Sequence, residues 1–187
     1  MNENDAPSSP KNTSPTSQLG LWSLIREDLR THRGEWSRPG FLALAVYRFG
    51  VWRMGIKPKL LRIPFSLLYR IAFIRCRNVY GIELPYSATV GRRLTIEHQG
   101  GIVVHGNAVI GDDCTLRQGC TLGIRRVDRP TEAPTLENGV SLGAGCAVLG
   151  HVQLGARCAI GANAVVLKDV PADAVAVGIP AQVVGGG

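Results

Sequence analysis

Hydrophobic residues recur at every sixth position in the second half of the chain, most regularly between residues 136 and 170. Six consecutive blocks of six open on an aliphatic residue: Leu136, Leu142, Val148, Leu154, Ile160 and Val166. The fifth residue of each block is small or β-branched: Val140, Cys146, Val152, Cys158, Ala164 and Val170. A period of six fits neither an α-helix nor a simple strand, and it is typical of a parallel β-helix solenoid. We therefore predict that the first and fifth residues point into the coil. The glycines at the second place, Gly143, Gly155 and Gly161, are expected to relieve the backbone at its corners.

The same period extends toward the N-terminus and is interrupted twice. Val104 follows Ile96 by eight positions instead of six. Leu136 follows Leu122 by fourteen positions, which is two more than two whole blocks. A solenoid accommodates insertions where they leave the coil as loops, and such loops often carry functional residues. We therefore expect the chemistry of this protein near residues 97–105 and 123–135.

Three regions are expected along the chain. Residues 1–20 are rich in Ser, Pro, Asn and Thr and are predicted to form a disordered tail without the pattern of a signal peptide. Residues 21–80 are predicted to form an α-helical N-terminal segment, and residues 81–187 the β-helix domain. The fold class is thus mainly β with a helical appendage.

Within residues 21–80, apolar spacing predicts helices over residues 21–33, 41–54 and, after Pro64, 65–77. No apolar run approaches the ~18–20 residues that a membrane-spanning helix needs. Two interpretations stay open. The helices form a cap packed on the coil or at a subunit contact, or they dock on a membrane surface as basic amphipathic helices.

The net charge of +7 belongs to the N-terminal part, because residues 1–80 hold 13 of the 21 Lys and Arg residues but only 5 of the 14 Asp and Glu residues. No nucleic-acid recognition motif accompanies this charge, so we expect no nucleic-acid partner. A surface of anionic lipid is favoured instead, since apolar residues flank the cations.

Five cysteines are present, and four occupy the fifth place of a block: Cys114, Cys120, Cys146 and Cys158. The absence of a CxxC pair and the odd count argue against a disulfide framework. We interpret these residues as buried small hydrophobes in a protein of the reducing cytoplasm.

Among the few ionisable residues of the coil, His98 lies inside the first irregularity. A neutral imidazole can take a proton from a hydroxyl group near neutral pH, and it needs a partner to fix its tautomer. Glu83 precedes His98 by fifteen residues, close to one turn of coil, and is a candidate partner. The alternative is an exposed histidine at a corner without a catalytic role. His105 and His151 do not complete a metal-ligand spacing with His98, so no metal site is expected.

Three stretches carry a family resemblance: GRRLTIEHQGGIVVHGNAVIGDDCTLRQGCTLG (91–123), GVSLGAGCAVLG (139–150) and IGANAVVLKDVPADAVAVGIPA (160–181). Together they resemble the left-handed hexapeptide-repeat acyltransferases. Within that class they are similar to the serine O-acetyltransferase family, especially its branch in exopolysaccharide and colanic acid biosynthesis. The helical lead-in, SLIREDLRTHR and FLALAVYRFGVW, is also similar to that family.

The resemblance implies a left-handed coil, a homotrimer, and acetyl-CoA in the groove between neighbouring coils. It implies that His98 is the general base and that Glu83 stands where the family has its paired aspartate. His98 would deprotonate an acceptor hydroxyl, which attacks the thioester carbonyl while backbone N–H groups stabilise the oxyanion. Matching positions for contact with acetyl-CoA are Gly123, Ala144 and Ala162 along the pantetheine arm, and Lys168, Gly178 and Pro180 near the nucleotide.

One departure from the family concerns the acceptor. Serine-acetylating members carry an Arg-His pair where this chain has Glu132 and Ala133, and the loss of a guanidinium weakens carboxylate recognition. Glu97 is expected to hold an ammonium group or to accept hydrogen bonds from sugar hydroxyls. Arg125, Arg126 and Arg129 are expected either to replace the lost cation or to meet an anionic saccharide or pyrophosphate carrier.

Three functions remain as hypotheses. The first is an O-acetyltransferase acting on a sugar of an exopolysaccharide or its lipid-linked precursor, in the cytoplasm or at the inner face of the membrane. The second is serine O-acetyltransferase in cysteine biosynthesis. The third is a non-catalytic trimeric scaffold, in which His98→Ala has no effect.

Overall fold

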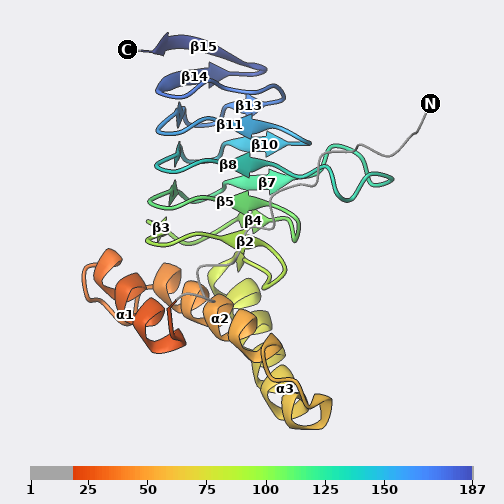
Figure 1. Cartoon of the computed structure of the whole chain (residues 1–187). Helices are drawn as coiled ribbons and strands as arrows, with labels where there is room; N and C mark the ends of the chain where they lie inside the picture. Colours follow the sequence, from red (N-terminus) through yellow and green to blue (C-terminus); the bar gives the residue numbers. More distant parts are fainter. Residues whose placement is uncertain (1–18, 187) are drawn as a thin grey trace, which may run out of the picture.

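The computed structural model describes residues 19–186 and consists of a helical base from which a triangular coil of strands rises (Figure 1). The predicted tail falls outside the described residues except for its last two. The helices are α1 (Leu21–Thr31), α2 (Pro39–Met54) and α3 (Lys59–Arg75), followed by a π-helical turn (Cys76–Tyr80). The strands are β1 (Ile82–Glu83), β2 (Thr89–Val90), β3 (Thr95–Ile96), β4 (Ile102–Val104), β5 (Val109–Ile110), β6 (Thr115–Leu116), β7 (Thr121–Gly123), β8 (Thr135–Leu136), β9 (Ser141–Leu142), β10 (Ala147–Leu149), β11 (Gln153–Leu154), β12 (Ala159–Ile160), β13 (Val165–Val166), β14 (Ala174–Gly178) and β15 (Ala181–Gly186).

The strands form three sheets, which are the three faces of the coil. Their orders are β1-β4-β7-β10-β13, β11-β8-β5-β2 and β15-β14-β12-β9-β6-β3, with parallel pairing except for the final β14–β15 pair. All twelve first-place and fifth-place residues of the six regular blocks are buried, none more than 5% exposed. The prediction of an inward-facing hexad is therefore confirmed, and the three sheets are those typical of the predicted left-handed β-helix.

The role predicted for the second-place glycines is wrong. The left-handed backbone angles fall at the fourth place of the blocks, as at Gly139 (φ 73°), Gly145 (φ 71°) and Asn163 (φ 57°). A second-place glycine is needed for a different reason, namely close approach of the next turn. A Cβ atom added to Gly143 would lie 2.6 Å from the backbone nitrogen of Ala162, so successive turns leave no room for a side chain there.

The two irregularities lengthen two turns of the coil. Ile96 pairs with Leu116, Leu116 with Leu142, and Leu142 with Ile160, which gives turns of 20, 26 and 18 residues. The first insertion widens the corner between β3 and β4. The second is a loop that projects from the coil between β7 and β8 (Figure 1). Leu122 and Leu136 therefore open consecutive blocks separated by one loop, as expected from the irregular spacing near residues 123–135.

Helices α1 and α2 pack against the first turns of the coil. Gly40 on α2 makes the closest approach, because a Cβ atom there would lie 2.3 Å from the carbonyl oxygen of Ile96. Beside it, the buried His32 ring accepts a hydrogen bond at Nε2 from the Ile96 N–H (3.2 Å) and contacts the Asp28 carbonyl oxygen through Nδ1 (2.7 Å). A neutral ring with its proton on Nδ1 satisfies both contacts.

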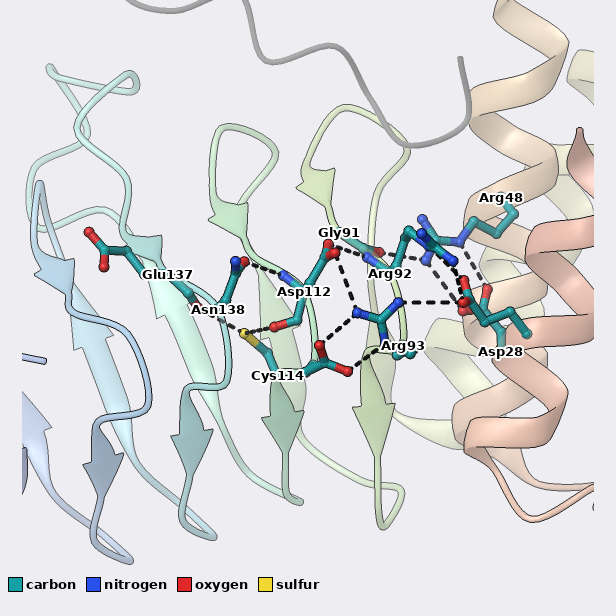
Figure 2. A network of polar contacts seen from close by, with 11 residues as sticks. Asp28, Arg48, Gly91, Arg92, Arg93, Asp112, Cys114, Glu137 and Asn138 are labelled. Atoms are coloured by element: carbon teal, nitrogen blue, oxygen red, sulfur yellow. Dashed lines mark hydrogen bonds and ion pairs between the residues drawn. The ribbon is translucent and has the colours of Figure 1, made fainter. Parts of the chain in front are cut away.

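A chain of ionic contacts ties this helical base to the coil (Figure 2). Asp28 and Arg48 form an ion pair of 2.9 Å with both side chains fully buried, and Arg48 also donates to the Gly91 carbonyl oxygen (2.7 Å). Arg92 pairs with Glu27 of α1 at 2.7 Å, and Arg93 pairs with Asp113 of the next turn at 2.6 Å. Burial raises the pKa of Asp28, although the Arg48 guanidinium opposes this effect.

The third helix begins at Lys59, earlier than the predicted start after Pro64. Pro58 is the residue before the helix, and Pro64 lies inside it. Proline removes one backbone donor to the carbonyl four residues earlier, here that of Leu60. Leu60 is 82% exposed, so water has access near this carbonyl. Across residues 19–186, no helix combines the length and the apolar character that crossing a membrane requires.

Candidate active site

One edge of the coil carries His98 and most of the small residues expected to contact acetyl-CoA. Strands β3, β6, β9, β12 and β14 lie in register through Ile96, Leu116, Leu142, Ile160 and Ala176. Two residues after each of these positions stand, in order, His98, Gln118, Ala144, Ala162 and Gly178. We call this column the His98 edge. Four strand spacings of ~4.8 Å make it about 19 Å long.

The backbone of the His98 edge is held by stacked left-handed corners. Gly81, Gly101, Gly119 and Gly145 all have φ between 64° and 74°. A Cβ atom on Gly119 would lie 3.1 Å from the Cα atom of Gly145, so each corner rests directly on the next. The Gly145 N–H donates to the Gln118 carbonyl oxygen, and the Asn163 N–H donates to that of Ala144, both at 2.8 Å. The edge is thus a rigid backbone surface with few large side chains.

Pro180 lies beside Gly178, in the turn between β14 and β15, but the other two predicted acetyl-CoA residues lie on a different edge. Gly123 ends β7, and Lys168 follows β13 by two residues, at the far side of the five-stranded sheet from His98. The loop of residues 124–134 leaves the coil from this second edge, which we call the loop edge. A single chain therefore divides the predicted site residues between two edges of one face.

His98 and Glu83 border the same corner from two turns. His98 is exposed and Glu83 is half-buried. Glu83 pairs in register with Val103, five residues beyond His98, because the first turn is 20 residues long. Gly81 and Gly100 are in close contact between the two turns, with an added Gly81 Cβ only 3.0 Å from the Gly100 Cα. Among the described residues, no hydrogen bond joins the two side chains, and their catalytic pairing stays a prediction.

An ion pair beside His98 was not foreseen from the sequence. The Arg117 Nε donates to the Glu97 Oε2 at 2.6 Å, and both side chains are more than one third exposed. The two residues lie one after the Ile96–Leu116 pair, at the same offset of 20 residues. A strict 18-residue turn would have put Thr115 there, so only the lengthened turn reveals the contact. Glu97 thus faces a cation of its own chain.

The arginines of the projecting loop are also engaged within it. Arg126 pairs with Asp128 at 2.8 Å, and Arg129 pairs with Glu132 at 2.9 Å. Arg125 packs beside Gly150, where an added Cβ would lie 2.8 Å from its Cδ atom. Ala133, where the family resemblance leads us to expect a histidine in a serine-acetylating enzyme, is 5% exposed.

The loop itself is anchored to the coil by Asn107, whose Nδ2 donates to the Pro130 carbonyl oxygen at 2.8 Å. Two of the three candidate guanidinium groups are therefore paired with carboxylates of the same loop. A third cation, Arg125, has its alkyl stem against the coil.

The remaining reactive side chains do not form a separate centre. In the described part of the chain, no three His, Cys, Asp or Glu side chains cluster as metal ligands would. All five cysteines are free and buried. Burial raises the pKa of the Cys114 thiol to about 11, which keeps it protonated and unreactive at neutral pH.

A hexapeptide coil with an exposed histidine corner is the architecture of a hexapeptide-repeat transferase. The family described as "Bacterial transferase hexapeptide (six repeats)" matches residues 133–168. WcaB of Escherichia coli K12, whose name assigns it to colanic acid biosynthesis as an acetyltransferase, is 42% identical over 163 residues, which cover 84% of this chain and 96% of WcaB.

Serine acetyltransferases match as well. The enzyme of Synechococcus elongatus is 39% identical over 150 residues, 78% of this chain, but the chain spans only 57% of that enzyme's length. A crystal structure of serine acetyltransferase from Brucella abortus in complex with coenzyme A superposes with a TM-score of 0.76 at 27% identity, covering 91% of this chain and 70% of that one. The chain belongs to the serine acetyltransferase family of hexapeptide-repeat acetyltransferases, as its motifs indicated.

Proposed function

We propose that this protein transfers the acetyl group of acetyl-CoA to a hydroxyl of a sugar, in an exopolysaccharide or its precursor. The observation that carries the choice of acceptor is the ion pair between Glu97 and Arg117 next to His98. A carboxylate already paired with a guanidinium attracts an ammonium group less than an unpaired one, while it can still accept hydrogen bonds from neutral hydroxyls. The buried Ala133 in place of a family histidine supports the same choice.

In the proposed reaction, His98 accepts the proton of the acceptor hydroxyl as its oxygen attacks the acetyl carbonyl carbon. The negative charge that develops on the carbonyl oxygen is stabilised by backbone N–H groups. The C–S bond then breaks, an ester forms, and the protonated His98 returns its proton to the CoA thiolate. Glu83, across the corner, would orient the imidazole and stabilise its charged form.

The small residues of the His98 edge support the binding of acetyl-CoA along it. Beyond Gln118, which follows His98 in this column, Ala144, Ala162 and Gly178 are small, so an extended arm can lie against the backbone there. Gly123 and Lys168 on the loop edge are too far round the coil to join the same column. We infer a homotrimer in which the loop edge of one copy completes the site at the His98 edge of its neighbour.

The relatives that are named as serine acetyltransferases support a second candidate function, serine O-acetyltransferase. The relative named for serine acetylation is 39% identical, close to the 42% of the relative named for colanic acid biosynthesis. The ion pair of Glu97 argues against it, because Glu97 is already paired with Arg117 and attracts the ammonium group of serine less than an unpaired carboxylate would. The reaction is proposed to take place in the cytoplasm, where reducing conditions keep the five free cysteines reduced.

Thiol release from acetyl-CoA by the purified protein tests the proposal, with L-serine in one series and glucose, galactose and their oligosaccharides in another. We expect release that depends on a saccharide and falls by about 10²–10⁴-fold in His98→Ala, the usual contribution of a general base. Arg157→Gln is the control, since Arg157 is an exposed residue between β11 and β12, on the third edge of the coil, away from both edges that carry predicted site residues. Release that depends only on L-serine would select the second candidate. No binding of acetyl-CoA by a correctly folded protein would leave the scaffold hypothesis.

A further inference from the structure

Helix α3 exposes a broad apolar face that nothing in the described chain covers. Of its seventeen residues, only Tyr69 is buried. Leu60 is 82% exposed, and Leu67 and Ile71 are each 59% exposed. These three residues share the face with four more exposed aliphatic side chains: Leu61, Ile63, Leu68 and Ile74. Contiguous apolar surface of this kind marks an interaction site in proteins. We call these seven residues the α3 face.

The opposite side of α3 is firmly packed, so the exposure does not come from an undocked helix. The Arg53 guanidinium lies between the rings of Tyr69 and Tyr86, 4.4 and 4.5 Å from their centres. The Tyr69 hydroxyl accepts a hydrogen bond from the Tyr86 N–H at 3.1 Å. Phe65 meets the Trp52 ring edge to face at 5.7 Å. The helix is fixed with its apolar face outward, and it extends away from the coil (Figure 1).

The charged residues in the segment that contains the α3 face are all cationic. Between Glu35 and Glu83 the chain contains nine Lys and Arg residues and no Asp or Glu. Five of the nine are exposed around α3: Lys57, Lys59, Arg70, Arg75 and Arg77. Two copies of this surface packed face to face would bring these like charges together without compensation. An anionic surface would instead be attracted to them.

A groove beside α3 adds room for an apolar chain. It has a volume of about 390 Å³ and lies between α2 and α3, with Val46, Phe49, Leu68 and Ala72 among its lining residues. Arg75 also lines it. An apolar groove bordered by a guanidinium suits a molecule with a hydrocarbon tail and an anionic head.

We propose that the α3 face docks on the surface of an anionic lipid bilayer. The apolar side chains enter the boundary between headgroups and acyl chains, and the surrounding cations meet the headgroup phosphates. Docking on the surface needs no spanning segment, in agreement with the lack of a membrane-crossing helix among the described residues. This surface is separate from the His98 edge, so the proposal holds whichever acceptor is used.

Cosedimentation of the full chain with vesicles tests the proposal. Binding to vesicles of phosphatidylcholine alone is compared with binding to vesicles in which one third of the phosphatidylcholine is replaced by phosphatidylglycerol. We expect binding to the anionic vesicles that weakens strongly near 1 M salt, where the Debye length is about 3 Å. Leu60→Ser and Leu67→Ser should each lower the partition coefficient by about tenfold or more, because each removes an exposed aliphatic side chain that the bilayer would bury. Arg70→Gln should lower it by about fivefold.

Two matched controls test whether the effect is specific to the α3 face or follows from the loss of any exposed apolar or cationic side chain. Val127→Ser removes a 90% exposed aliphatic side chain from the projecting loop, and Arg157→Gln removes an exposed cation from the coil. Neither should change vesicle binding. The unfolding temperature of the α3 variants should stay near that of the unaltered protein, since their side chains do not contribute to the core.

The mass of the protein in solution, measured for the same variants, tests the alternative that the α3 face is an interface between copies of this chain. If Leu60→Ser and Leu67→Ser reduce the number of associated copies, and the unaltered protein ignores anionic vesicles, the α3 face is an interface between copies and the proposal is overturned. Equal binding to both vesicle types, insensitive to salt, would also overturn the role of the cations.

Discussion

Arg117 donates a hydrogen bond of 2.6 Å to Glu97, the residue immediately before His98. The contact compensates the negative charge next to the proposed general base and so bears on which acceptor can bind. Arg117→Gln removes the positive charge and leaves Glu97 unpaired. We expect any L-serine-dependent thiol release to rise by up to about fivefold, the upper range for an exposed charge pair.

Glu97→Gln combined with Arg117→Gln is the control, because it removes both charges and should cancel the gain with serine. A fall in serine-dependent release in the Arg117→Gln variant would mean that Arg117 holds the serine carboxylate. The selectivity argument for a sugar acceptor would then fail.

Glu83 should influence the rate of transfer more than the binding of acetyl-CoA. Glu83→Gln keeps the shape of the side chain but cannot stabilise a charged imidazole, so we expect kcat to fall by about tenfold, or ~1.4 kcal/mol of activation free energy. The affinity for CoA, measured by calorimetry, should not change. A variant with unaltered kcat would show that the two side chains do not pair during the reaction.

Activity should require neighbouring copies, because the predicted site residues are divided between two edges. His98→Ala affects one edge, and Lys168→Glu reverses the charge on the other. Each variant alone should be weakly active. Mixed trimers assembled at random from equal amounts should regain about one quarter of full activity, since that fraction of sites joins two intact edges. If mixed assemblies gain nothing over the separate variants, each site lies within one chain.

His32 should make the fold sensitive to mild acid. Burial lowers the pKa of this ring, and both ring nitrogens are already used by the neutral form. The unfolded chain therefore binds more protons than the folded one below about pH 6.5. Stability should fall as the pH drops through that region, by up to ~1.4 kcal/mol per pH unit from this group.

Urea unfolding at pH 7.5 and pH 5.5 measures the effect. His32→Gln should be less stable at pH 7.5 but should lose less stability between the two values than the unaltered protein. An identical loss in both proteins would assign the acid sensitivity to other groups.

The buried ion pair between Asp28 and Arg48 should be costly to break from one side. Asp28→Asn leaves the Arg48 guanidinium as an uncompensated buried charge, and Arg48→Met leaves the Asp28 carboxylate uncompensated. For each variant we expect a loss of about 3–5 kcal/mol in unfolding free energy. The double variant Asp28→Leu/Arg48→Met should recover much of this loss. Arg157→Gln, which breaks an exposed pair, should change stability by less than about 1 kcal/mol. Single variants as stable as the exposed-pair control would contradict the assigned burial.

The sequence by itself determined the solenoid and its core. A repeat of six identifies inward positions one by one, because each turn of the coil buries the same places, and Leu142, Cys146 and Val148 could be placed without any tertiary information. It also singled out His98 as a candidate, since this histidine lies in the first irregular corner of the coil.

The tertiary structure alone decided which residues meet across turns. The insertions make the turns 20 and 26 residues long, so residues such as Glu97 and Arg117 come together at distances that a fixed period does not give. It also reassigned the second-place glycines, because the limit at Gly143 is the approach of the next turn and not its own backbone angle. In the helical base, apolar spacing located α3, but only packing decides which of its apolar residues are covered. Tyr69 is held against the base, while Leu60, Leu67 and Ile71 remain at the surface.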